Sequence, residues 1–117
     1  MKSILIIEDE PDIQELLRAY LEDAGYQTAV TGDGAAALER FGAQPFDLVL
    51  LDLMLPKIDG FGVCACIRRQ SQVPILMLTA LDGEESQLRG FGMDIDDYVT
   101  KPFSMPVLLE KIRVILH

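Results

Sequence analysis

The sequence has 117 residues, half of them hydrophobic and a quarter charged, with a formal net charge of −9. This length suits one globular domain with its own core, over residues 1–117, and the composition excludes a disordered chain. The negative charge argues against direct nucleic acid binding by this domain, because phosphates would be repelled. A protein partner or a cation is the better expectation.

The first half of the chain alternates between apolar strands and amphipathic helices. A strand is predicted over 3–7, and a helix follows that has Pro11 in its first turn and stops at Gly25. A second strand is predicted over 26–30. A turn containing two glycines then leads into a helix over 35–41.

The second half repeats this pattern. The most apolar run of the chain, 48–51, predicts a strand buried on both faces, and Asp52 stands at its end. Asp82 and Glu85 have capping-box spacing, which predicts a helix after the fourth strand. The remaining predicted elements are a helix from Asp59 to about Arg69, strands over 74–78 and 97–99, and a last helix over 104–116.

Five such β-α units without repeats or linkers indicate the α/β class, with right-handed crossovers between parallel strands. We expect a doubly wound, five-stranded parallel sheet in the flavodoxin-like order 2-1-3-4-5, with five helices distributed over both faces. No apolar stretch is long enough to span a bilayer, so no membrane association is expected. The early acidic residues argue against a signal peptide, and we expect a cytoplasmic location.

Polar side chains gather where the predicted strands end. Glu8 and Asp9 follow the first strand, Asp52 ends the third, Thr79 ends the fourth, and Lys101 comes shortly after the fifth. The carboxyl ends of parallel strands meet at one rim of a sheet, and ligands bind at that rim in open α/β folds. We therefore expect these five side chains to form one site.

The chemistry of this group points to phosphate and a metal. Carboxylates of Glu8, Asp9 and Asp52 brought together repel one another, which requires raised pKa values or a bound cation. Oxygen ligands without His or Cys favour a hard ion, and Mg²⁺ suits a site with few carboxylates. Lys101 and Thr79 supply an ammonium and a hydroxyl for phosphoryl oxygens, and Asp52 could act as a nucleophile.

With these residues in this order, the sequence resembles the receiver domain of a two-component response regulator over essentially its whole length. The resemblance rests on Glu8-Asp9, the segment 52–60 (DLMLPKIDG), Thr79-Ala80 and the segment 97–103 (DYVTKPF). Each motif alone is weakly specific, but their order and their positions at strand ends are very specific together.

The resemblance implies that Asp52 accepts a phosphoryl group from the phosphohistidine of a sensor histidine kinase. It implies that Asp9, Asp52 and the Met54 carbonyl bind Mg²⁺ directly, that Glu8 acts through water, and that Thr79 and Lys101 hold the phosphoryl oxygens. Such a domain catalyses its own phosphotransfer and dephosphorylation, and we do not expect it to act as an enzyme on a diffusible substrate. The family often has a cis bond where Lys101 precedes Pro102 here, and X-Pro bonds tolerate cis.

The resemblance also implies a switch and an output surface. Thr79 moves toward the phosphate, Tyr98 turns inward, and the change is relayed to the surface of the fourth helix, fifth strand and fifth helix. Similarity to the winged-helix DNA-binding subfamily implies a homodimer through that surface on phosphorylation, with control of a transcriptional effector domain outside this chain. Asp97 and Lys111 stand where one charged pair crosses that dimer.

Two departures from the subfamily pattern lie on the output face. Gln87 and Val107 stand where a second charged pair is usual, and Asp94-Ile95 replaces a pair of small residues. Neither departure touches the expected phosphorylation site.

Other interpretations stay open at this stage. Taken singly, Asp52 could be a strand-end cap or a turn residue that starts a helix, and Glu8 and Asp9 could cap the first helix. The corresponding alternatives are a β-branched strand residue for Thr79, a solvated lysine for Lys101 and a partly buried ring for Tyr98. As function classes, a flavodoxin-like mononucleotide binder, a degenerate receiver that signals without phosphate and a metal hydrolase compete with the phosphorylation switch. The acidic loop after the first strand disfavours a mononucleotide binder, because it would repel phosphate. The presence of the acids and the lysine disfavours a degenerate receiver. The short chain leaves little room for the substrate pocket of a metal hydrolase.

Overall fold

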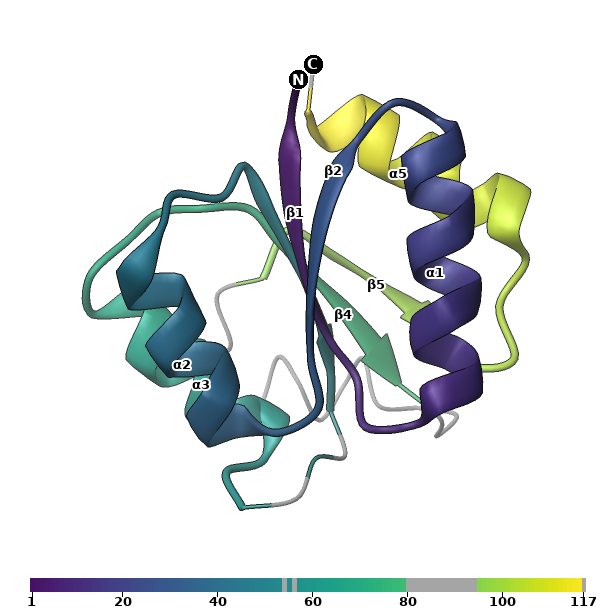
Figure 1. Ribbon diagram of the computed structural model, residues 1–117. Coiled ribbons are helices and arrows are strands. Elements are labelled where there is room, and N and C mark those ends of the chain that lie inside the picture. The colour runs from purple at the N-terminus through teal and green to yellow at the C-terminus, as the bar shows by residue number, and fades with distance from the viewer. Residues whose placement is uncertain (54, 56, 80–94, 117) are drawn as a thin grey trace.

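Five parallel strands form one sheet in the order β2-β1-β3-β4-β5, as the sequence predicted. The computed structural model describes residues 1–53, 55, 57–79 and 95–116. Figure 1 shows the twisted sheet between two layers of helices. The strands are β1 (Ser3–Ile7), β2 (Gln27–Thr31), β3 (Leu48–Asp52), β4 (Ile75–Thr79) and β5 (Asp97–Thr100).

Helices cover both faces of the sheet, with α2 and α3 on one side and α1 and α5 on the other (Figure 1). Their bounds are α1 (Pro11–Asp23), α2 (Gly34–Ala43), α3 (Gly60–Arg68) and α5 (Met105–Ile115). The predicted fourth helix, the one that contains Asp82 and Glu85, falls on 80–94 and lies outside the described residues. Within the described ranges, no helix combines the length and apolar character needed to cross a bilayer.

The apolar core is divided by the sheet into two clusters. Alternate residues of each central strand face opposite sides, so Leu5 and Val49 pack toward α2 and α3, whereas Ile4 and Leu50 pack toward α1 and α5. Every residue of β3 is buried, which confirms the prediction that this strand is covered on both faces.

Local signals in the sequence explain where the helices begin and end. The carboxylates of Asp33 and Asp59 accept hydrogen bonds from the Ala36 and Gly62 amides, which caps α2 and α3. The end of α1 is a Schellman motif, with Gly25 at φ 98° and the Tyr26 N–H donating to the Leu21 carbonyl at 3.0 Å.

This motif corrects one predicted boundary, because Tyr26 belongs to the helix cap and β2 begins at Gln27. At the other end, Thr31 belongs to β2, since its carbonyl accepts a hydrogen bond from the Glu8 N–H.

Candidate functional site

Buried polar side chains lie at the carboxyl ends of three neighbouring strands. Glu8 directly follows β1, Asp52 ends β3 and Thr79 ends β4, and all three are almost wholly inaccessible to solvent. The backbone N–H of Lys101, just beyond β5, donates to the Thr79 carbonyl at 2.6 Å. The sheet therefore brings together the strand ends that the sequence singled out.

The ammonium of Lys101 is the centre of this group. Its Nζ lies 2.6 Å from Glu8 Oε1, 3.3 Å from Asp52 Oδ2 and 3.9 Å from Glu10 Oε1. The side chain of Lys101 is only 14% exposed. The Lys101 ammonium, in the loop after β5, thus bridges residues at the ends of β1 and β3 that are far from it in sequence.

Burial and charge act in opposite directions on these groups. Burial disfavours the ionised Glu8 carboxyl, but the hydrogen bond from Lys101, the contact with Asp52 and the Glu10 N–H hold its pKa below the ordinary value. Burial likewise disfavours the Lys101 ammonium, but the Glu8 hydrogen bond and the Asp52 charge raise its pKa above the ordinary value. The fold thus keeps a Glu8–Lys101 ion pair charged in a largely buried place.

The acidic residues also offer a set of oxygen ligands. Glu8, Asp9 and Glu10 each have a carboxylate oxygen within 4.8 Å of the others, with Glu8 buried and the other two exposed. Asp52 shares the Lys101 ammonium with Glu8. A set made only of oxygens, open to solvent on one side, fits Mg²⁺, which keeps several waters. The predicted Met54 carbonyl lies outside the described residues.

Glu10 is a member of this group that the sequence interpretation did not select. Its carboxylate lies near both the Lys101 ammonium and the other acids. The signal in the sequence is the unbroken acidic run Glu8-Asp9-Glu10.

Glycine at position 60 lets α3 begin against the backbone of the Asp52 strand. A Cβ at this position would lie 2.7 Å from the Asp52 carbonyl oxygen and 2.7 Å from Leu53 Cα. The Gly60 N–H donates to the Leu53 carbonyl at 2.9 Å, which fixes the close approach. The conformation of the chain around Asp52 therefore depends on a residue without a side chain.

Of the two predicted switch residues, Thr79 belongs to the rim cluster, whereas Tyr98 and the described output residues lie elsewhere on the domain. Tyr98 is half-buried and packs against the apolar cluster on the α2 and α3 side. Asp97 and Lys111 form an ion pair within the chain at 2.8 Å, and Val107 is 51% exposed on α5. Gln87 and Asp94 fall outside the described residues.

An apolar groove opens beside the rim cluster. It has a volume of about 430 Å³ and is lined by Glu10, Ile13, Leu16, Lys101, Pro102 and Phe103. The Lys101-Pro102 peptide bond in its wall is cis, as predicted. The groove places apolar surface on α1 next to the Lys101 ammonium.

Comparison with known proteins identifies the family of this chain. Residues 4–113 match the family model described as the response regulator receiver domain. The chain is 44% identical over its whole length to the sensory transduction protein RegX3 of Mycolicibacterium smegmatis, covering 51% of that protein. It is 44% identical over 99% of its length to the "probable transcriptional regulator ycf27" of Guillardia theta, covering 46% of that protein. The chain thus spans about half the length of these relatives.

A solved structure shows the same architecture. The response regulator TrrA of Thermotoga maritima, in complex with Mg²⁺ and BeF, superposes with a TM-score of 0.89. The two are 38% identical over 99% of this chain and 100% of that one.

Proposed function

The chain belongs to the response regulator receiver domain family of phosphorylation-based signalling proteins, and on this premise we propose that Asp52 is its phosphoryl acceptor. The observation that carries the proposal is the position of Asp52, buried at the end of β3 with an oxygen 3.3 Å from the Lys101 ammonium. Burying an ionised carboxylate without a partner would cost folding free energy. The Lys101 ammonium offsets that cost, and a buried charged pair of this kind is typical of functional sites.

In the proposed reaction, an Asp52 oxygen attacks the phosphorus of a sensor kinase phosphohistidine. A P–O bond forms, the P–N bond breaks, and the imidazole leaves with the bonding electron pair and takes up a proton. Lys101 offsets the charge on the phosphoryl oxygens, and the Thr79 hydroxyl donates a hydrogen bond to one of them. Mg²⁺, held by Asp9, Asp52 and the Met54 carbonyl, with Glu8 acting through water, would supply further positive charge when bound.

Phosphorylation is then proposed to bias the positions of Thr79 and Tyr98. A new charge-assisted hydrogen bond draws Thr79 toward the phosphate, and the ring of Tyr98 follows into the space. The change is proposed to reach the predicted output surface, of which the structure describes β5 and α5, and we propose that two copies dimerise there. In this proposal, the domain works in the cytoplasm and controls a transcriptional effector domain beyond this chain.

Phosphorylation can be tested with Mg²⁺ and acetyl phosphate, followed by intact-mass analysis. The protein should gain one phosphoryl group, and the gain should disappear with a chelator and in Asp52→Asn. Asp23→Asn, an exposed carboxylate on α1, is the matched control and should label like the parent. A folded parent that gains no mass, or an Asp52→Asn variant that still gains it, would overturn the assignment.

We also infer that the kinase contacts the apolar groove beside Lys101. The donor histidine must come within bonding distance of Asp52, and the groove is apolar surface at that rim, continued by the exposed side chains of Leu16 and Tyr20. Leu16→Glu should slow transfer from a sensor kinase phosphohistidine while leaving acetyl phosphate labelling unchanged. Equal slowing of both reactions would contradict a docking role and indicate a disturbed site.

A further inference from the structure

The outer edge of the sheet at β2 presents unpaired backbone groups. β2 is the first strand of the order and pairs only with β1 in the described part of the chain. The Gln27 N–H donates to the Lys2 carbonyl and the Thr31 carbonyl accepts from the Glu8 N–H, so these residues face inward. Peptide groups alternate in direction along a strand, and those of Thr28 and Val30 therefore face away from the sheet.

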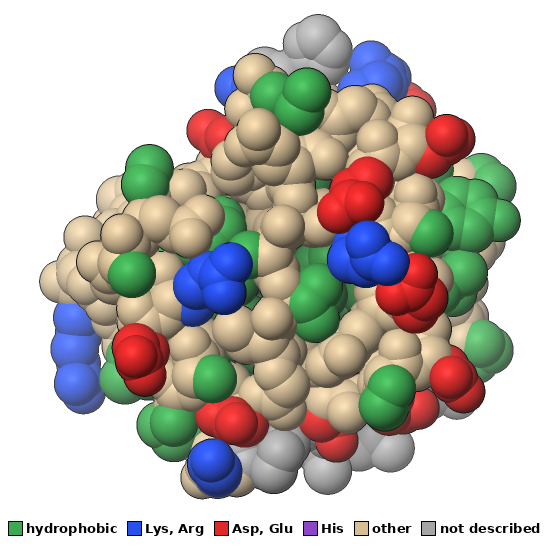
Figure 2. Space-filling view, in the orientation of Figure 1, with side chains coloured by type: hydrophobic (Ala, Val, Ile, Leu, Met, Phe, Trp, Pro, Cys, Tyr) green, Lys and Arg blue, Asp and Glu red, His purple; other side chains and the backbone are tan. Residues whose placement is uncertain are grey.

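This edge lies in a groove rather than on a flat surface. Figure 1 shows β2 running between α1 and α2, and Figure 2 shows basic side chains on both sides of the middle of this face, with backbone or uncharged polar atoms between them. Hollows of about 360 Å³ and about 450 Å³ lie toward the two ends of β2. Arg40 of α2 lines both of them, so the two hollows share this wall. We call them together the β2 groove.

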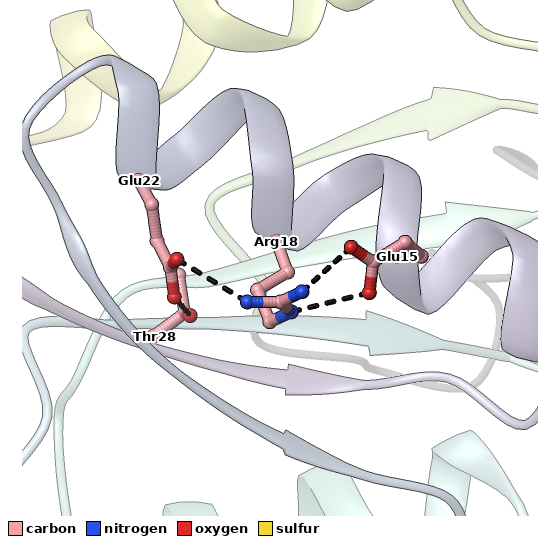
Figure 3. A network of polar contacts seen from close by, with 4 residues as sticks. All are labelled: Glu15, Arg18, Glu22 and Thr28. Carbon is pink, nitrogen blue, oxygen red and sulfur yellow. Dashed lines mark hydrogen bonds and ion pairs between the residues drawn. The ribbon is translucent and has the colours of Figure 1, made fainter.

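The basic residues on the two sides of the groove differ in their partners. On the α1 side, Arg18 lies between Glu15 at 2.6 Å and Glu22 at 3.4 Å, and Glu22 also accepts a hydrogen bond from the Thr28 hydroxyl (Figure 3). On the α2 side, Arg40 donates to the Gln44 side-chain oxygen at 3.1 Å, and the described residues include no carboxylate in ion-pair range of it. Glu22 and Glu39 also line the two hollows, so the favourable place for a ligand carboxylate is at the Arg40 guanidinium, whose remaining donors are available.

We propose that the β2 groove binds an extended, acidic segment of a partner protein, which adds to the sheet as a strand beside β2. The segment would pair with the outward peptide groups of Thr28 and Val30 and place a carboxylate on Arg40. A single extended strand fits this recess. The β2 strand of a second copy has no acidic residue, so strand pairing between two copies would not itself place a carboxylate on Arg40.

The groove is separate from the proposed phosphorylation chemistry. Its lining residues include none of Glu8, Asp52 and Lys101. Asp52→Asn should therefore bind the segment like the parent, and failure of either proposal can be recognised without the other.

The test uses two defined probes and the whole chain. The probes are short synthetic peptides of alternating Thr and Val with a central Asp or, as the matched control, a central Lys. In an NMR titration, the Asp peptide should shift the amide signals of Thr28, Val30 and Arg40 and slow hydrogen exchange at Thr28 and Val30. It should bind about tenfold more tightly than the Lys peptide, the effect of one charge-assisted contact.

Variants separate the backbone contribution from the charge contribution. Thr28→Pro removes an outward N–H without removing a bond to β1, and should abolish binding, whereas Thr28→Val should retain it. Arg40→Glu should reverse the preference between the two peptides. If Thr28→Pro does not fold, an Asp peptide methylated at its backbone nitrogens should fail to bind the parent protein.

Three results would overturn the proposal. The first is the absence of shifts at β2 with millimolar Asp peptide, and the second is equal binding of the Asp and Lys peptides. The third is concentration-dependent protection of the Thr28 and Val30 amides without peptide, which would show that a second copy covers the edge.

Discussion

Two charged clusters in this domain are built from the same kinds of side chain but differ in burial. At the rim, Lys101 joins Glu8 and Asp52, whose side chains are 0% and 4% exposed. On α1, Arg18 joins Glu15 and Glu22, which are 65% and 45% exposed. Water screens the second cluster and leaves it little net effect, whereas in the first each charge depends on its partners. Ion-pair distances alone would not distinguish the exposed Arg18 cluster on the surface of α1 from the buried Lys101 cluster of the candidate site.

Removing the central cation should give the largest difference between the clusters. Lys101→Met leaves Glu8 and Asp52 buried without a counter-charge, and we expect a loss of about 3 kcal/mol in the free energy of unfolding. Millimolar Mg²⁺ should restore part of this loss by binding only the folded state. Urea unfolding with chelator and with Mg²⁺ measures both effects. Lys57→Met, at a lysine that is 67% exposed, is the control, and an equal loss in both variants would contradict the comparison.

Moving the rim backbone without changing its charge should have the next largest effect. In Gly60→Ala, the added methyl meets backbone atoms of Asp52 and Leu53 that cannot yield, and we expect a loss of about 2 kcal/mol. Acetyl phosphate labelling should slow as Asp52 is displaced. Gly42→Ala is the control, because it lies in α2 with open space around it and should stabilise by about 0.5–1 kcal/mol. Unchanged labelling in Gly60→Ala would show that this contact does not position Asp52.

The pH dependence of stability should follow the buried ion pair, not the exposed one. The pKa of Glu8 is lowered in the folded protein, so its stabilising effect is complete above its unfolded value near 4.5 and is lost as pH falls through the lower folded value. The pKa of Lys101 is raised, so its effect is complete below its unfolded value near 10.5 and is lost as pH rises through the higher folded value.

Thermal unfolding across these pH ranges measures this dependence. The parent should have a plateau between the two limits and lose stability on the acid side, and Glu8→Gln should have a shallower acid limb. A parallel acid limb in the parent and in Glu8→Gln would show that other carboxylates dominate.

Removing the exposed cation should have the smallest effect. Arg18→Ala deletes both ion pairs on α1, yet the high exposure of all three side chains predicts no measurable change in the unfolding midpoint at physiological salt. Differential scanning calorimetry at low and physiological salt is the measurement. A loss comparable to that of Lys101→Met would remove the distinction between the two clusters.

The sequence predicted the sheet, its strand order and the side of the molecule where the polar residues gather. Short continuous apolar runs, helix-length amphipathic segments and punctuation by Gly and Pro are local signals, and they place Glu8, Asp52 and Thr79 at strand ends. The sequence did not predict which of these side chains contact one another at the rim. That Lys101 bonds Glu8 more closely than Asp52, and that Glu10 joins the group, depends on side-chain reach across three strands.

Asp97 and Lys111 illustrate a different limit. The resemblance places them on a dimer surface, and that role stays a prediction. Within one chain the structure pairs them with each other at 2.8 Å, which the sequence did not predict. Strand β5 and helix α5 pack as neighbours, and that packing makes the internal pair possible.

By itself, the sequence determined which residues are apolar and at what period, and therefore the α/β architecture and the common rim. Only the tertiary structure decided how deeply each charge is buried and which charges face one another. Burial is set by the whole sheet and its covering helices rather than by any local segment. The tertiary structure also decided that the edge of β2 lies open beside Arg40, because an unpaired edge exists only relative to the other strands of the sheet.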